Sequence, residues 1–175
     1  MDARPPIDAS RPGGLRLAGF VLTAMGAILI GLGATRTWVT VGLSGVQTNT
    51  NTAIKGIDMV EGKISLACAL VMLIGVLGAR MVADRRLRIG LASLINGTAV
   101  LAAIVAMNFL QDGLDRQVVL DAVGVPRAQW VAIGVFREFG PGVYWVRAGG
   151  LIGFAGAVLT LVWAVRSARA PAAEA

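Results

Sequence analysis

Four long apolar runs dominate the pattern of the chain, and more polar segments separate them. The runs cover residues 17–35, 64–83, 89–110 and 146–165. A helix needs about 20 apolar residues to cross the roughly 30 Å hydrocarbon core of a bilayer. Each run is long enough, and no charged residue lies at its centre. The pattern therefore predicts an all-α membrane protein with four transmembrane helices in one domain, residues 17–165.

The segments outside these runs divide into two tails and two longer loops. We expect a disordered cytoplasmic tail at residues 1–16, a second cytoplasmic tail at 166–175, and outer loops at 36–63 and 111–145. The first run is expected to stay in the protein as a helix. A cleaved signal peptide is disfavoured, because no clear small-residue cleavage site follows the run and three more apolar runs come later.

The distribution of basic residues predicts the orientation. The tails and the short turn around residues 84–88 are rich in arginine, whereas the two loops dilute their basic residues with acids. Cytoplasmic segments carry the excess of Lys and Arg in multi-pass proteins. We therefore expect a plasma-membrane protein with both termini cytoplasmic. Trp38, Tyr144 and Trp145 should then anchor the outer interface, and Trp163 the inner one.

The first outer loop has the pattern of a small β-hairpin. Residues 37–43 alternate in the period of a strand, and the Thr-rich residues 47–54 can pair back with them. Asp58 is expected to cap the second helix, with Glu61 three residues later completing a capping box. A calcium site at these acids is disfavoured, because calcium needs six or more oxygen ligands.

The second outer loop is expected to contain two short helices. Residues 114–123 place apolar side chains at helical spacing with acids between them. Residues 127–140 are expected to form a second helix in the membrane interface, with Trp130, Val131 and Phe136 toward lipid or the hairpin. Together the two loops predict a small extracytoplasmic cap of a β-hairpin and short helices.

Small residues spaced by four predict where the helices pack. Such residues let helix backbones approach closely in a membrane. They are Thr23, Ala27, Gly31 and Thr35 in the first run, Gly75 and Ala79 in the second, and Gly149, Gly153 and Ala157 in the fourth. The contact can lie within one bundle or between copies. Ser93, Asn96 and Asn108 of the third run are expected to hydrogen-bond across helices rather than to touch a substrate.

The composition provides few residues that could take part in catalysis. The chain has 175 residues, 56% hydrophobic and 15% charged, with no His and one Cys, and its net charge is +6. The absence of His removes the commonest general base and metal ligand. Cys68 lies in an apolar run and is expected to be a small packing residue. We therefore expect that the protein is not an enzyme and that it binds no cofactor or metal. Because the arginines flank the apolar runs, we also expect that the protein does not bind nucleic acid.

Two stretches carry a resemblance to a known group of proteins. The first begins with Arg-Thr-Trp directly after the first run and continues through the strand-like loop to "GIDMVEGKISLACALVMLIGVLG". The second is "FGPGVYWVRAGGLIGFAGAVLTLV". The chain resembles small four-helix membrane proteins of high-GC Gram-positive bacteria, including the tryptophan-operon-associated type. The resemblance implies the topology and an actinobacterial host rather than a chemistry. The layout is also similar to that of claudins, without their paired loop cysteines.

These observations favour a binding role. We expect a non-enzymatic accessory or scaffold subunit that binds a protein or lipid partner through its outer cap. The alternative is a subunit of an oligomeric channel or transporter, lined by Ser93, Asn96 and Asn108. A proton-coupled transporter within one copy lacks the usual membrane-embedded carboxylate, and no helix is broken by proline.

Overall fold

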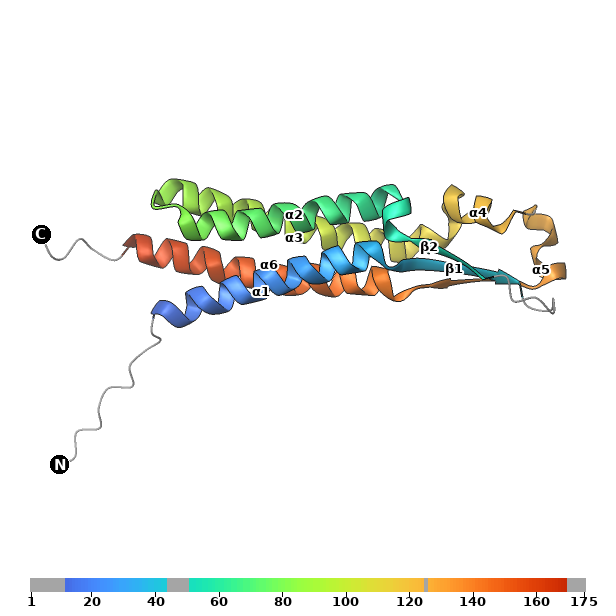
Figure 1. Ribbon diagram of the computed structural model, residues 1–175, viewed down its shortest axis with the longest axis horizontal. Helices are drawn as coiled ribbons and strands as arrows, with labels where there is room; N and C mark the ends of the chain where they lie inside the picture. The colour runs from blue at the N-terminus through green and yellow to red at the C-terminus, as the bar shows by residue number, and fades with distance from the viewer. Residues whose placement is uncertain (1–11, 44–50, 125, 170–175) are drawn as a thin grey trace, which may run out of the picture.

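The computed structural model describes residues 12–43, 51–124 and 126–169, and within them the chain forms a long helical bundle with a cap at one end (Figure 1). The bundle consists of α1 (Pro12–Thr35), α2 (Val60–Met81), α3 (Arg85–Asp112) and α6 (Pro141–Arg169). All four helices are long and apolar enough to cross a membrane. The expectation of four such helices is confirmed.

Three of the helices extend well beyond the predicted runs. Proline suits the first position of a helix, where its missing N–H is not needed, and both α1 and α6 begin at a proline. Residues 12–16 and 166–169, which were expected in the tails, are therefore helical. The remaining tail residues, 1–11 and 170–175, lie outside the described part.

The start of α1, the end of α6 and the α2–α3 turn lie at the end of the bundle opposite the cap (Figure 1). Asp84 caps α3 in this turn, since its Oδ1 accepts from the backbone N–H groups of Arg86 at 2.7 Å and Leu87 at 3.2 Å. Arg88 donates to the carbonyl oxygen of Val82 at 3.0 Å. The turn is thus closed by its own side chains.

Glycines bring the backbones of α1 and α6 into contact. A Cβ atom at Gly26 would lie 2.4 Å from the backbone nitrogen of Gly153, and one at Gly33 would lie 2.6 Å from the carbonyl oxygen of Gly142. The contact residues repeat every seven positions. They are Gly19, Gly26 and Gly33 in α1, and Gly142, Gly149 and Gly156 in α6. Only hydrogen fits at these crossings.

The predicted packing residues fall on this seam only in part. Thr23, Ala27, Gly149, Gly153 and Ala157 are buried, as are Gly75 and Ala79 in α2. Gly31 is only half-buried, however, and Thr35 is exposed. A spacing of four rotates by about 40° per step around a helix of 3.6 residues per turn, whereas a spacing of seven rotates by only about 20°. The α1 stripe was therefore wrong at its C-terminal end.

The cap is built on a three-stranded antiparallel sheet in the order β2-β1-β3. The strands are β1 (Thr37–Leu43), β2 (Thr52–Lys55) and β3 (Val135–Phe139). The antiparallel pairing of β1 with a second strand is confirmed, but β2 covers only the end of the expected residues 47–54; residues 44–50 lie outside the described part. The short helix α4 (Gln117–Val123) also confirms the prediction for residues 114–123.

The interfacial helix expected at residues 127–140 was wrong. This segment forms a 3-10 helix (Arg127–Gln129), a single turn of α-helix called α5 (Trp130–Ile133), and then β3. Gly134 ends α5 in the left-handed conformation, at φ 65°. A left-handed residue at this position stops a helix, and the chain that follows pairs with β1.

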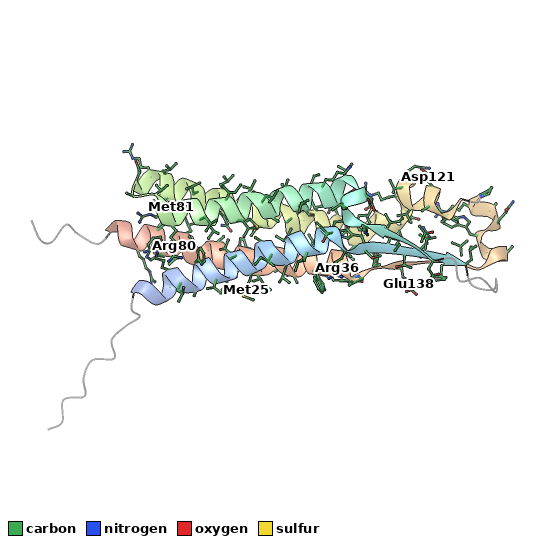
Figure 2. The ribbon with its side chains drawn as sticks, in the orientation of Figure 1. Met25, Arg36, Arg80, Met81, Asp121 and Glu138 are labelled. Carbon is green, nitrogen blue, oxygen red and sulfur yellow. The ribbon has the colours of Figure 1, made fainter. Side chains whose placement is uncertain are left out.

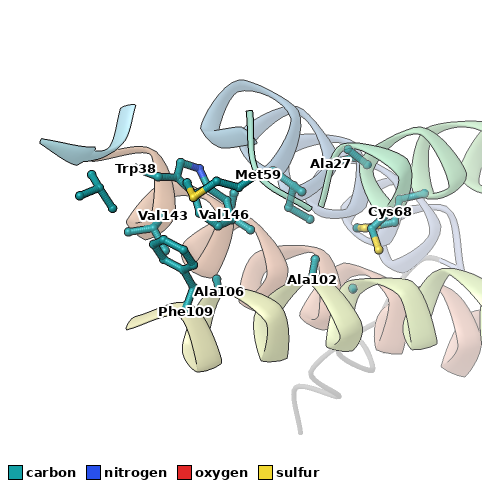
Figure 3. Close-up of a cluster of buried hydrophobic side chains, with 14 of the residues drawn as sticks. Ala27, Trp38, Met59, Cys68, Ala102, Ala106, Phe109, Val143 and Val146 are labelled. Carbon is teal, nitrogen blue, oxygen red and sulfur yellow. The ribbon is translucent and has the colours of Figure 1, made fainter. Parts of the chain in front are cut away.

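Trp38 closes the bundle beneath the cap and is fully buried. Its Nε1 donates to the carbonyl oxygen of Gly33 at 2.9 Å, and its ring meets that of Phe109 edge to face at 4.9 Å. Figure 3 shows Phe109, Val143 and Val146 gathered near the ring. The expectation that Trp38 anchors a lipid interface was wrong, because the ring is fully buried between the end of the bundle and the cap.

The other expected anchors keep some exposure. Tyr144 and Trp145 are 48% and 39% exposed on α6, close to the cap, and Trp163 is half-buried at the opposite end. Their exposure is compatible with the interface role, which stays a prediction.

The capping box expected at Asp58 and Glu61 was also wrong. Asp58 ends a short 3-10 helix (Gly56–Asp58), and its Oδ2 accepts from the backbone N–H of Lys55 at 3.2 Å. Helix α2 begins at Val60 without a side-chain cap. Glu61 lies in its first turn, 3.7 Å from the guanidinium of Arg116.

Candidate interaction surface on the cap

Three polar residues are buried in the described part of the bundle, and the hydroxyl of each is bound to its own helix. The hydroxyls of the buried Thr23, Ser65 and Thr160 donate to the carbonyl four residues earlier, at 2.8 to 2.9 Å. Cys68 is buried among apolar side chains. Within the described ranges no group of three or more His, Cys, Asp or Glu could hold a metal ion. The interior of this part of the bundle therefore offers no connected polar path.

The polar residues of α3 do not join the helices as expected. Ser93 and Asn108 are exposed on the outside of the bundle. Asn96 is half-buried, and its side-chain oxygen is buried without a hydrogen-bond partner in the described part of the chain. The structure thus places these three residues on or near the outer side of α3. Their expected role as cross-helix hydrogen-bond partners was wrong.

The inner face of the cap sheet is packed with apolar side chains, and its arginine forms an ion pair. Val39 and Val41 of β1 are buried on this face, and so is Val119 of α4. Arg137 of β3 donates to the carbonyl oxygen of Leu114 and to Asp115 at 3.1 Å, and its guanidinium lies 4.8 Å from the centre of the Trp130 ring. These contacts tie the third strand to the end of α3.

Arg137 is expected to contribute more to the cap than its neighbour Arg127, although both pair with Asp115. The Arg137 side chain is only 22% exposed, against 69% for Arg127. Arg137→Ala should lower the free energy of unfolding of the cap by about 1–3 kcal/mol, since it removes charge-assisted bonds to the part-buried carbonyl of Leu114 and to Asp115. Arg127→Ala should cost less than about 1 kcal/mol. Protease sensitivity of residues 113–140 measures the difference, and equal sensitivity would contradict it.

No described helix or strand covers the opposite face of the sheet. We define the open face by five residues on the three strands: Thr40, Gly42, Ala53, Phe136 and Glu138. Ala53 and Glu138 are exposed, and Thr40 and Phe136 are half-buried. Figure 2 shows Glu138 on the side of the sheet away from α4, which carries Asp121. An antiparallel sheet often has one packed face and one uncovered face.

At the centre of the open face, Gly42 lies beneath an aromatic ring. A Cβ atom at Gly42 would lie 2.3 Å from the Phe136 ring, its cross-strand neighbour. The ring therefore lies across the glycine beside the small side chains of Thr40 and Ala53. Such a surface offers apolar contact, the hydroxyl of Thr40 and the carboxylate of Glu138.

Sequence reasoning missed this face because it depends on β3. The five residues Val135–Phe139 are bounded by Gly134 and Gly140, and they are rich in residues that favour strands. Those boundaries were a signal for a strand. The residues just before the strand have helical spacing, and this spacing led to the prediction of a helix over the whole segment.

No protein-family model matches the chain, and no curated protein matches its sequence. The suspected relationship to small actinobacterial four-helix proteins therefore stays a prediction. The functional interpretation depends on the geometry of the cap and the bundle.

Proposed function

We propose that the protein is a multi-pass protein of the plasma membrane, with both termini in the cytoplasm and the cap outside. Four helices of membrane-spanning length and composition support this placement. The start of α1, the end of α6 and the α2–α3 turn share one end of the bundle, and the arginine-rich segments adjoin that end. Arginine-rich short segments favour the cytoplasmic side.

Within that membrane, the protein acts as a non-enzymatic accessory or scaffold subunit that binds a protein partner through the open face of its cap. The observation that carries this proposal is the uncovered open face on an otherwise packed cap. The inner face is filled by α4, and Arg116, Arg127 and Arg137 are paired with acids of the same region. Aromatic side chains are enriched in protein interfaces, and the Phe136 ring reaches from the edge strand β3 over Gly42 of the central strand.

The attachment of the cap to the bundle also supports a binding role. Trp38 joins β1 to the end of α1, and Phe109 and Phe139 link α3 to β3, with ring centres 6.1 Å apart. A surface held in one geometry loses less conformational entropy when a partner binds.

Two substitutions on opposite sides of the cap test this proposal. Ala53→Arg adds a long charged side chain to the open face, whereas Val118→Arg adds one to α4, where Val118 is 48% exposed. Ala53→Arg should weaken a native complex at least tenfold, because burying an unpaired charge is costly. Val118→Arg should leave it intact. Native gel mobility of the tagged protein from its own host measures the complex, and loss of the complex only in Val118→Arg would contradict the proposal.

The second candidate is an oligomeric channel or transporter subunit, and one feature of α3 favours it. The side-chain oxygen of Asn96 lacks a partner, and Ser93 and Asn108 face outward. Polar groups on a lipid-facing surface are costly, so a second copy could cover Ser93 and Asn108. Loss of a transport activity in an Asn96→Ala/Asn108→Ala double variant would favour this candidate over cap binding.

A further inference from the structure

A cavity of about 260 Å³ opens at the end of the bundle opposite the cap. It lies between α1, α2 and α6, and its walls include Phe20, Val76 and Ala79. Arg16 of α1 and Arg80 of α2 also line it, and so does Trp163 of α6. The cavity thus has an apolar interior with two arginine side chains.

The arginines are held close to the aromatic rings. The guanidinium carbon of Arg16 lies 5.0 Å from the centre of the Trp163 ring, and that of Arg80 lies 5.2 Å from the Phe20 ring. Arg88, from the start of α3, is a third cation at 5.2 Å from the Trp163 ring. Cation–π contacts of this kind fix the guanidinium of Arg16 and Arg80 while leaving its N–H donors available. Arg88 contributes its charge, since its guanidinium already donates to the carbonyl oxygens of Val82 and Ala83.

No described carboxylate balances these charges. Every ion pair in the described part of the chain involves Arg116, Arg127 or Arg137, all of which belong to the region of the cap. Asp84 lies in the nearby turn, but its carboxylate accepts two backbone N–H groups of α3. Three positive side chains therefore meet at one end of the bundle, where an anion would relieve their repulsion.

The surface around the cavity is apolar along the helices. Leu17 and Val21 of α1 are 62% and 42% exposed, and Leu77 and Met81 of α2 are 53% and 86% exposed. A ligand that satisfies both the cations and this surface has an anionic head and a hydrocarbon tail. Basic cavities between membrane helices suit such ligands.

We propose that this cavity binds the headgroup of an anionic phospholipid, with the lipid phosphate between Arg16 and Arg80 and an acyl chain along the exposed apolar side chains of α1 or α2. The site rests on the bilayer placement given above but not on the cap. Guanidinium groups bind phosphate through paired N–H donors. Trp163 then has a defined task, since it supports the Arg16 side chain beneath the headgroup.

Native mass spectrometry of the full-length protein in detergent tests the site. Phosphatidylglycerol and phosphatidylcholine with the same acyl chains are added in equal amounts. We expect the wild-type protein to retain phosphatidylglycerol about tenfold more strongly, and Arg16→Gln/Arg80→Gln to lose this preference. Arg36→Gln is the matched control, since Arg36 lies over Trp145 at the other end of α1, with 5.8 Å between the guanidinium carbon and the ring centre. It should retain the preference.

Three outcomes would overturn the proposal. Equal retention of the two lipids by the wild-type protein would do so without any variant. An equal loss of preference in Arg36→Gln would assign the effect to general surface charge. Displacement of the lipid by excess inorganic phosphate would assign the cavity to a free anion. None of these outcomes would alter the binding expected at the open face, so the two proposals fail independently.

Discussion

Trp38→Ala is expected to lower the free energy of unfolding by about 3–5 kcal/mol, because it empties a large buried site in a packed interior. The ring is fully buried, and it contacts Phe109 edge to face. Its loss also leaves the carbonyl oxygen of Gly33 without the indole donor. Since β1 and α1 meet at this residue, the cap should separate from the bundle more readily.

Unfolding in mixed micelles with increasing dodecyl sulfate measures this effect. Trp145→Ala is the control, because Trp145 is 39% exposed and lies on the outer side of α6. Trp38→Phe retains most of the ring but not the donor, and it should cost about 0.5–1.5 kcal/mol plus the missing volume. If Trp38→Ala cost no more than Trp145→Ala, the ring would not close the bundle as described.

Gly26→Ala is expected to destabilise the bundle by about 1–3 kcal/mol or more, although it adds a single methyl group. The new Cβ would lie 2.4 Å from the backbone nitrogen of Gly153 and 2.6 Å from the carbonyl oxygen of Gly149. Backbone atoms cannot rotate away as a side chain does. The helices α1 and α6 must therefore move apart along their whole contact.

Gly97→Ala in α3 is the matched control for this substitution. Nothing lies within 4 Å of a Cβ atom built at Gly97, so the methyl group should be tolerated. Thermal unfolding in detergent, followed by loss of helical circular dichroism, compares the two variants. Equal midpoints for Gly26→Ala and Gly97→Ala would show that α1 and α6 do not touch through their glycines.

The features that the sequence predicted well depend on local patterns. Four apolar runs of about 20 residues specify four long helices, since length and composition alone determine that a segment can span a membrane. The hairpin at Thr37–Lys55 was visible in the alternation of β1. The short helix α4 was visible in its apolar spacing.

The features that were missed depend on contacts between distant segments. Trp38 was expected at a lipid interface because tryptophans are common there. Only its packing against Phe109, 71 positions later in the chain, shows that it is buried. The strand β3 likewise gains its hydrogen bonds from β1, which lies almost 100 residues earlier.

The seam of α1 was misplaced for a different reason. A spacing of four residues looks regular in the sequence, but it drifts around the helix. The repeat of seven at Gly19, Gly26 and Gly33 was present in the sequence and gives the correct face. The open face could not be found in this way, because its residues come from three strands.

Photo-crosslinking from single positions of the cap tests the proposed function most directly. A benzophenone side chain is placed at Ala53 on the open face, at Val118 on α4, or at Met81 at the opposite end, and the cells are irradiated before lysis. Val118 is 48% exposed and Met81 86% exposed, so both controls are accessible. We expect one discrete protein adduct from Ala53 and none of the same size from Val118 or Met81. No adduct from Ala53, or the same adduct from all three positions, would contradict binding through the open face.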